Sequence, residues 1–182
     1  MRKVILNLAT TLDGFIEGVN GELDWCLLEE DMRFDSFLES IDTIFYGRVS
    51  YDLWGNYQPE ASASGMEKQI HAAIQSKKKF VFSRQPRSDD KATFINTDVV
   101  AQVKKIKNQP GKDIWLYGGA KLITTFVENG LVDEYMISVH PTVLGAGKPL
   151  FDISARLSLV LIKTNVFKSG VVQLIYTAHT KQ

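Results

Sequence analysis

Along the first 130 residues, apolar and polar positions follow a pattern of short strands, each followed by a helix. Runs of β-branched and aromatic residues bounded by small or polar ones predict buried strands. Apolar residues spaced three and four apart predict amphipathic helices between them. The predicted strands are 4–9, 43–46, 80–82 and 114–117, and the predicted helices are 29–41, 48–53, 66–74, 99–106 and 122–127.

The pattern changes after Asp133. Residues 135–139, 157–162 and 171–176 all have the character of strands, with no helical spacing between them. Residues 168–170, Lys-Ser-Gly, separate the last two as in a hairpin. We therefore expect an α/β fold with a mixed sheet, mostly parallel and ending in an antiparallel hairpin. At 182 residues, the chain is expected to form a single domain over 1–182.

Composition narrows the possible classes of function. The chain has 21 basic and 21 acidic residues, and this balance argues against nucleic acid as the main partner. No run of about 18 apolar residues occurs, so we expect neither a membrane span nor a membrane partner. Cys26 is the single cysteine, which suits a reducing compartment, and the short apolar start does not resemble a signal peptide. The expected location is the cytoplasm.

Two junctions between a predicted strand and helix carry glycine. One strand ends in Tyr46-Gly47 before Arg48, and another ends in Tyr117-Gly118-Gly119 before Ala120. Unpaired amides and the positive end of the helix dipole make such a junction an anion site. Glycine leaves the backbone accessible to a phosphate. A single such turn is common in proteins, whereas two of them plus a strand ending in Ser83-Arg84 favour a dinucleotide.

The Rossmann pattern G-x-G-x-x-G and the P-loop are both absent. Four motifs instead resemble, in order and spacing, the dihydrofolate-reductase-like fold, a three-layer α/β/α arrangement. The closest resemblance is to the reductase domain of the bifunctional riboflavin-biosynthesis deaminase-reductase, and it covers essentially the whole chain. The motifs are Thr11-Leu12-Asp13-Gly14-Phe15-Ile16, Gly47-Arg48-Val49-Ser50-Tyr51-Asp52, Phe82-Ser83-Arg84 and Tyr117-Gly118-Gly119-Ala120.

This resemblance implies NADPH as the cofactor, and it assigns residues to the binding site. Arg48 and Arg84 would bind the 2′-phosphate through charge-assisted bonds, which favours NADPH over NADH. Both arginines also fit the alternative of solvated loop residues. The cofactor-binding residues that the resemblance implies are Ala9, Thr10, Gly47, Arg48, Ser50, Ser83, Arg84, Gly118, Gly119, Ala120 and Lys121.

Hydride transfer to a substrate also needs a proton, and carboxylic acids near the pocket are the candidates. Asp13 follows the first strand, and Asp31 extends the apolar stripe of Phe34 towards the end of its predicted helix. In dihydrofolate reductase a carboxylate preceded by a tryptophan loop binds the pteridine, and Trp25 and Asp31 resemble that arrangement, although the spacing differs by a residue. We therefore take Asp31 and Asp13 as catalytic candidates, and Trp25, Asp31 and Phe34 as substrate contacts. The alternative for Asp31 is a helix-start carboxylate that only favours the dipole.

The resemblance implies reduction of a small pyrimidine-ribosyl or related heterocyclic substrate. The specific expectation is reduction of a ribosyl group on an aminopyrimidine, as in 5-amino-6-(5-phosphoribosylamino)uracil. Dihydrofolate reduction and a non-catalytic NADPH-binding module are the alternatives. His71, His140 and His179 lack metal-ligand spacing, so no metal site is expected. The late strands leave an edge that must be covered, and related reductases are often dimers, so we expect a homodimer.

Overall fold

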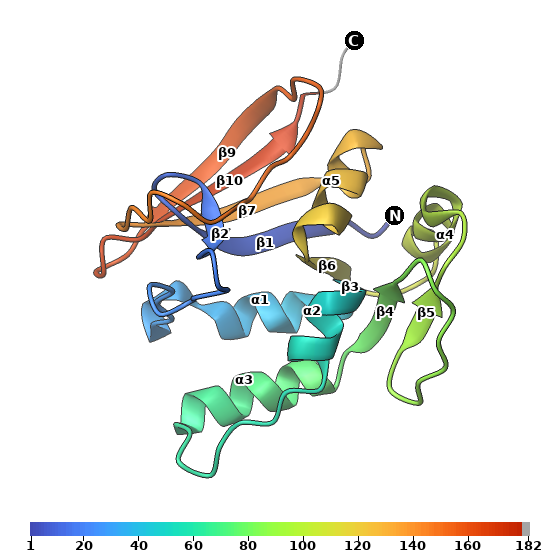
Figure 1. Cartoon of the computed structure of the whole chain (residues 1–182), viewed down its shortest axis with the longest axis horizontal. Helices are drawn as coiled ribbons and strands as arrows, with labels where there is room; N and C mark the ends of the chain where they lie inside the picture. The colour runs from blue at the N-terminus through green and yellow to red at the C-terminus, as the bar shows by residue number, and fades with distance from the viewer. Residues whose placement is uncertain (180–182) are drawn as a thin grey trace.

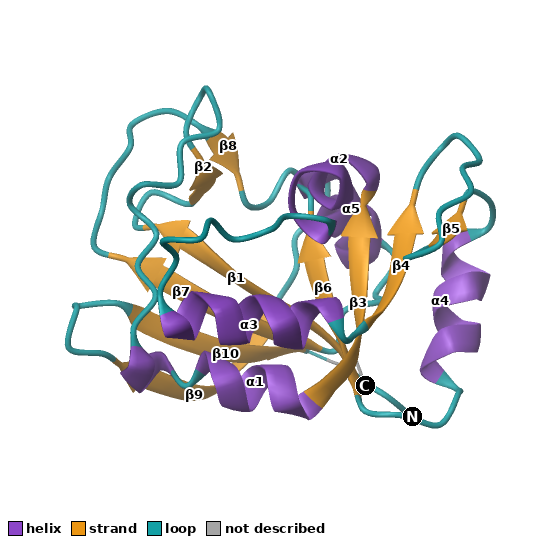
Figure 2. Cartoon of the chain, turned by 90° about the horizontal axis from the view of Figure 1, so that it is seen from below, coloured by secondary structure: helices purple, strands orange, loops and turns teal. Residues whose placement is uncertain are grey.

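The computed structural model describes residues 1–179, in which eight strands form one twisted sheet (Figures 1 and 2). Their order is β5-β4-β3-β6-β1-β7-β10-β9, parallel from β5 to β7 and antiparallel for the last two. A separate ribbon pairs β2 with β8. The strands are β1 (Val4–Thr11), β2 (Phe15–Glu17), β3 (Ile41–Gly47), β4 (Lys78–Phe82), β5 (Thr93–Ile95), β6 (Asp113–Gly118), β7 (Glu134–His140), β8 (Lys148–Pro149), β9 (Leu159–Val166) and β10 (Val172–Ala178).

Helices cover both faces of the sheet, so the architecture has three layers. α1 and α3 pack against one face, and α4 and α5 against the other (Figure 2). Each face has its own apolar core, because successive strand residues point to opposite sides. The helical segments are η1 (Glu30–Met32), α1 (Phe34–Ser40), α2 (Arg48–Ser50), η2 (Tyr51–Gly55), α3 (Gly65–Gln75), α4 (Val99–Lys107) and α5 (Ala120–Glu128).

The two ends of the parallel strands differ in chemistry. At the amino ends, the buried side chain of Arg2 pairs with Asp42, and the buried Lys107 lies 2.6 Å from Asp133. Asp133 also accepts the amide of Val4 at 2.7 Å. Both pairs tie neighbouring elements together at this edge. The carboxyl ends of β1, β3, β4, β6 and β7 form the opposite edge, where the glycine turns lie.

Most sequence predictions are confirmed. The mixed sheet and the helix predicted over 99–106 both occur, and the side chain of Asp98 accepts the amide of Ala101 at 3.1 Å. The terminal hairpin turns through Gly170, whose φ is 87°.

The single helix predicted over 29–41 is wrong. Arg33 adopts a left-handed conformation (φ 51°, ψ 40°), which separates the short η1 from α1. A non-glycine residue with positive φ cannot continue a right-handed helix. Asp31 therefore lies on η1, one turn outside α1. Strand β5 and the β2–β8 ribbon are short elements that the apolar pattern does not predict.

Phe45 stabilises the core beneath α5. It is fully buried, and its ring contacts those of Phe80, Phe82 and Phe126 at centroid distances of 5.9, 5.2 and 5.7 Å. We predict that Phe45→Ala lowers the free energy of unfolding by about 3–5 kcal/mol, because it removes a packed ring and leaves a cavity. Urea unfolding measures this, with the exposed Phe151→Ala as control. If Phe45→Ala lowered the free energy of unfolding no more than Phe151→Ala does, Phe45 would not be a stabilising core residue.

Candidate functional site

The two glycine turns meet at the carboxyl edge of the sheet. β3 ends at Gly47 and the neighbouring β6 ends at Gly118, so the turns are adjacent. A Cβ added at Gly47 would lie 3.1 Å from the amide nitrogen of Gly119. This approach is tighter than ordinary contacts, so the two backbones come together only because Gly47 has no side chain. Gly118 has a φ of 119°, which also requires glycine, and the Gly118–Gly119 peptide bond is cis.

Two helices begin directly at these turns. α2 starts after Gly47 and continues as η2, and α5 starts after Gly119. The first amides of a helix have no partner inside it, so both starts present N–H donors to an anion. A Cβ on Gly119 would lie 3.0 Å from the hydroxyl of Ser50, which places that hydroxyl beside the second turn. Ala120 and the exposed Lys121 form the first turn of α5. The structure thus brings together the turn residues that the sequence analysis singled out.

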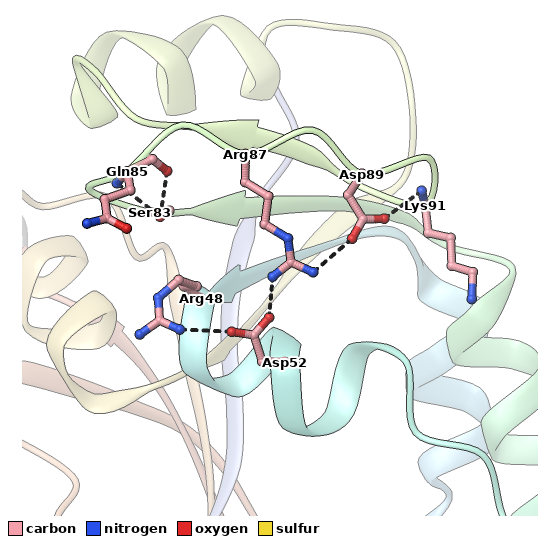
Figure 3. A network of polar contacts seen from close by, with 7 residues as sticks. All are labelled: Arg48, Asp52, Ser83, Gln85, Arg87, Asp89 and Lys91. Carbon is pink, nitrogen blue, oxygen red and sulfur yellow. Dashed lines mark hydrogen bonds and ion pairs between the residues drawn. The ribbon is translucent and has the colours of Figure 1, made fainter.

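An arginine-rich network lies beside α2 and the loop after β4 (Figure 3). Arg48 donates to one carboxylate oxygen of Asp52 at 2.9 Å, and Arg87 donates to the other at 2.5 Å. Arg87 also reaches Asp89 at 3.3 Å and covers the ring of Phe94 at 5.1 Å. One carboxylate thereby holds two guanidinium groups close together. Arg48, Asp52 and Arg87 are exposed, so their ion pairs position the side chains more than they stabilise the fold.

Ser83 and Arg84 follow β4 at the same edge. The hydroxyl of Ser83 accepts the amide of Gln85 at 3.2 Å and donates to its carbonyl at 2.8 Å, which shapes the turn. Arg84 is exposed. Figure 3 shows Ser83 on the side of the network where Arg48 lies.

The end of β1 is tied to the loop after β7. Thr10 is buried and its hydroxyl donates to the carbonyl of Phe15 at 3.1 Å, while Ala9 precedes it in the strand. Asp13 accepts the hydroxyl of Thr11 at 2.6 Å and the amide of Gly145 at 2.8 Å. The bond from Thr11, reinforced by that amide, lowers the pKa of the Asp13 carboxyl below its ordinary 3.8. A carboxylate held ionised in this way clamps two loops and is poorly suited to donate a proton.

Asp31 and the two predicted aromatic contacts occupy different surroundings. Asp31 is exposed and accepts the amide of Lys168 in the terminal hairpin at 3.3 Å. Phe34 packs edge-on against Trp115 at 5.6 Å in the core under α1. Trp25 is buried, with its ring edge-on to His140 at 5.3 Å, and it anchors the loop after β2 to β7. Their roles towards a substrate stay predictions.

A narrow aromatic slot is lined by residues of the sheet, η2 and α3. These residues lie on the face of the sheet that packs against α1 and α3. The volume of the slot is about 130 Å³. Tyr46 and Tyr117 line it, and they directly precede the glycines of the two turns. The slot thus lies next to the glycine turns. The remaining lining residues are Trp54, Tyr57, Glu67, Ile70, His71 and Ile74.

Sequence reasoning missed Arg87 and the slot. Arg87 stands 35 residues after Asp52 and in no recognisable motif, so only the fold brings them together. The slot draws on β3, η2, α3 and β6, and its aromatic residues look like ordinary core positions in the sequence. The one sequence feature that could have indicated the slot is the tyrosine that precedes each glycine turn, Tyr46 and Tyr117. Within residues 1–179, the structure has no group of three His, Cys, Asp or Glu side chains arranged to hold a metal, and it contains no helix long and apolar enough to cross a membrane.

Comparison with known proteins identifies the family. The model of the RibD C-terminal domain matches residues 2–173. The chain belongs to this family. It is 56% identical to the uncharacterised protein YyaP of Bacillus subtilis, over 96% of this chain and 94% of that protein. It is 34% identical to the uncharacterised protein YwjB of the same organism, over 96% and 97% of the two chains.

Solved structures agree on the fold. A putative riboflavin biosynthesis protein from Shewanella superposes with a TM-score of 0.77 at 23% identity, covering 98% of this chain and 99% of that one. The deaminase/5-amino-6-(5-phosphoribosylamino)uracil reductase of Thermotoga maritima gives 0.68 at 16%, covering 98% and 57%. Dihydrofolate reductase from Enterococcus faecalis, complexed with NADP(H), gives 0.66 at 14%, covering 97% and 96%. The three-layer dihydrofolate-reductase-like fold expected from the sequence is therefore confirmed.

The clamp at Asp13 gives a pH-dependent prediction. A carboxyl whose pKa is lowered in the folded state adds stability above its unfolded pKa, and that stability is lost as the pH falls through the folded value. We predict that Asp13→Asn lowers the thermal midpoint at pH 7 and that the gap to wild type narrows below about pH 4. Scanning calorimetry at both pH values measures this, with the exposed Asp24→Asn as control. A gap that stays constant from pH 7 to pH 3 would contradict the ionised clamp.

Proposed function

We propose that this protein is an NADPH-dependent reductase of a small heterocyclic substrate, of the pyrimidine type handled by riboflavin-biosynthesis reductases. The observation that carries the proposal is the contact between the Gly47 and Gly118–Gly119 turns at one sheet edge. Family membership supports it, because the resembling proteins include a named reductase and a reductase complexed with NADP(H).

The glycine turns fit a dinucleotide. The amides at the start of α2 and α5 would bind its phosphates, with Ser50 donating from beside them and Lys121 adding a positive charge. Ala9 and Thr10, at the end of the central β1, would form the wall beside the reacting ring. When bound, NADPH supplies the hydride. The protein's contribution is to hold the two reactants within about 3–3.5 Å and to exclude water.

The arginines support NADPH over NADH. Arg48, Arg84 and the newly found Arg87 surround the region next to the first turn. Guanidinium groups bind a phosphate dianion with paired, charge-assisted bonds. Asp52 already holds two of them close together, and an entering phosphate would share their N–H donors with that carboxylate.

Cofactor binding is the first prediction to test. NADPH at 100 times its dissociation constant should stabilise the protein by about 2.7 kcal/mol, measured by thermal shift. Arg48→Ala and Arg84→Ala should each weaken NADPH binding about tenfold, because each removes a charged bond, and should leave NADH affinity nearly unchanged. Gly47→Ala should weaken both cofactors alike, since its Cβ would push the turns apart.

Arg156→Ala is the matched control, because Arg156 is an exposed arginine just before β9, towards the opposite edge of the sheet. The absence of any shift with NADPH would overturn the proposed cofactor. Equal losses of NADPH and NADH in Arg48→Ala would remove the 2′-phosphate assignment and keep the cofactor itself.

Substrate assays separate the enzyme classes. The pyrimidine-ribosyl reading predicts NADPH oxidation with an aminopyrimidine substrate, and the alternative reading predicts it with dihydrofolate. Tight NADPH binding without turnover on either, or on a panel of carbonyl compounds, would favour a non-catalytic binding module.

The proton donor is a separate prediction. We keep Asp31 as the candidate, since it is an exposed carboxyl on the same face as the slot. Asp31→Asn should depress turnover at least tenfold and leave the dissociation constant of NADPH unchanged, because only proton delivery is removed. The exposed Asp35→Asn, on the neighbouring α1, serves as control. Unaltered turnover would exclude Asp31 as the proton donor and leave it a structural role, accepting the hairpin amide of Lys168.

We also propose that two copies associate through the edge strand β9, and that the protein works in the cytoplasm, where its single cysteine suits a reducing environment. An unpaired edge strand invites pairing with another chain. On β9, Ile162 is 62% exposed and Val166 is 76% exposed.

For this association, we predict a dimer for wild type and a monomer for Ile162→Lys in analytical ultracentrifugation, because a charge on the apolar edge opposes pairing. The control is Val143→Lys, equally exposed on a loop. A wild-type monomer at micromolar concentration would refute the dimer.

A further inference from the structure

His140 ends β7 at the carboxyl edge of the sheet and is almost completely buried, with 1% of its surface exposed. It is not among the residues proposed to bind the cofactor or the substrate. Each of its two ring nitrogens faces a backbone carbonyl oxygen. Nδ1 lies 3.0 Å from the carbonyl oxygen of Ser138, in the same strand, and Nε2 lies 3.2 Å from that of Leu27.

These two acceptors restrict the protonation of the ring. A carbonyl oxygen can only accept a hydrogen bond, so each contact is a hydrogen bond only when the facing nitrogen carries a proton. A neutral imidazole has one N–H, and the imidazolium has two. Both bonds of His140 therefore exist together only in the charged ring, and the neutral ring has to lose one of them.

The bond to Leu27 is the one that the neutral ring loses more easily. Ser138 lies within β7, which pairs with β1 on one side and β10 on the other, so its carbonyl is fixed. Leu27 lies in the segment 18–28, between β2 and η1, which contains no helix or strand. The bond to Leu27 is also the longer of the two. Loss of a proton therefore releases this segment from β7.

The segment 18–28 has few other attachments. Its other hydrogen bonds join its own residues, such as the bond from Trp25 to the carbonyl of Glu22 at 3.3 Å. Within residues 1–179, the bond from His140 is the one that joins the segment to another element. Trp25 is its only large side chain that is buried, and that ring lies edge-on against His140 at 5.3 Å. Both attachments thus involve the same histidine.

No carboxylate in the described part of the chain forms an ion pair with this ring. The titratable side chains on the neighbouring elements have other surroundings, namely Asp13 in the clamp to Gly145, Glu22 bonded to Asn20, Cys26 near the phenol of Tyr117, Glu29 beside η1 and the exposed Asp24. The two carbonyl partners are therefore the groups that favour the charged form of the ring.

We infer that His140 positions the segment 18–28 and that it does so fully only as the imidazolium. As the pH rises through the range in which histidine loses its charge, about pH 5–8, the bond to Leu27 is lost and the segment loosens. Only the consequence rests on the proposed function. The segment carries Trp25, a predicted substrate contact, and leads to Asp31, so its loosening would affect the substrate side of the site.

NMR of the histidine rings in the full, ¹⁵N-labelled chain, without cofactor or substrate, measures the charge of His140. The chain has three histidines, and the ring signal missing from His140→Asn assigns this one. We expect protons on both of its nitrogens at about pH 5.5, and on Nδ1 alone at about pH 8.5. The same number of ring protons at both pH values would overturn the inference.

Hydrogen exchange followed by mass spectrometry measures the segment itself. After correction for the effect of pH on the intrinsic exchange rate, residues 18–28 should be about tenfold less protected at the higher pH, because a hydrogen bond from a charged donor is lost. Residues 134–139 of β7 should keep their protection. Equal corrected protection of residues 18–28 at both pH values would refute the proton-dependent positioning.

Two variants assign the effect to one histidine. His140→Asn cannot become charged, so the protection of residues 18–28 should be low and the same at both pH values. His71→Asn is the matched control, because Nε2 of His71 also faces one carbonyl, that of Tyr57, outside the segment. It should keep the pH dependence of wild type.

A pH dependence that persists in His140→Asn, or that disappears in His71→Asn, would assign the effect to another group and overturn the inference. The NMR measurement uses the wild-type chain, so it decides the question even if His140→Asn does not fold. Because no measurement contains NADPH, failure of the proposed cofactor to bind would leave these results unchanged.

Discussion

The contact between the glycine turns after β3 and β6 is the constraint on which the site depends. The carboxyl ends of adjacent parallel strands lie about one strand spacing apart, about 4.8 Å, and a Cβ at Gly47 would lie only 3.1 Å from the amide nitrogen of Gly119. Removing that side chain lets two helix starts face the same space. The first amides of α2 and α5, the neighbouring Arg48 and the aromatic slot all lie around this contact.

The two faces of the sheet contribute differently around this edge. The face under α4 and α5 is a closed apolar core, with Phe45 and Phe126 fully buried. The other face, under α1 and α3, leaves the slot between its helices and the sheet. Because strand residues alternate between faces, Phe45 and Tyr46 serve these two purposes from neighbouring positions in one strand.

The sequence predicted the site where its signals are local. Glycine at the end of a strand indicates a close backbone approach or a positive φ, so Gly47 and Gly118–Gly119 could be identified from the sequence. The spacing of apolar residues predicted most of the helices. The prediction failed where a feature depends on the conformation of a single residue or on contacts between residues far apart in the sequence. Nothing in the apolar spacing reveals that Arg33 turns left-handed, and Arg87 meets Asp52 only through the fold. Tyr46 and Trp54 look like core residues until α3 is placed beside them.

Two ion pairs hold the amino ends of the strands together, at the edge of the sheet opposite the glycine turns. Arg2 with Asp42 and Lys107 with Asp133 tie the chain start, β3, α4 and the segment before β7 together far from the glycine turns. Residues at the carboxyl edge therefore do not have to hold the amino ends of the strands together. A substitution at the carboxyl edge therefore leaves these two ion pairs in place, so the two edges of the sheet can change independently of each other.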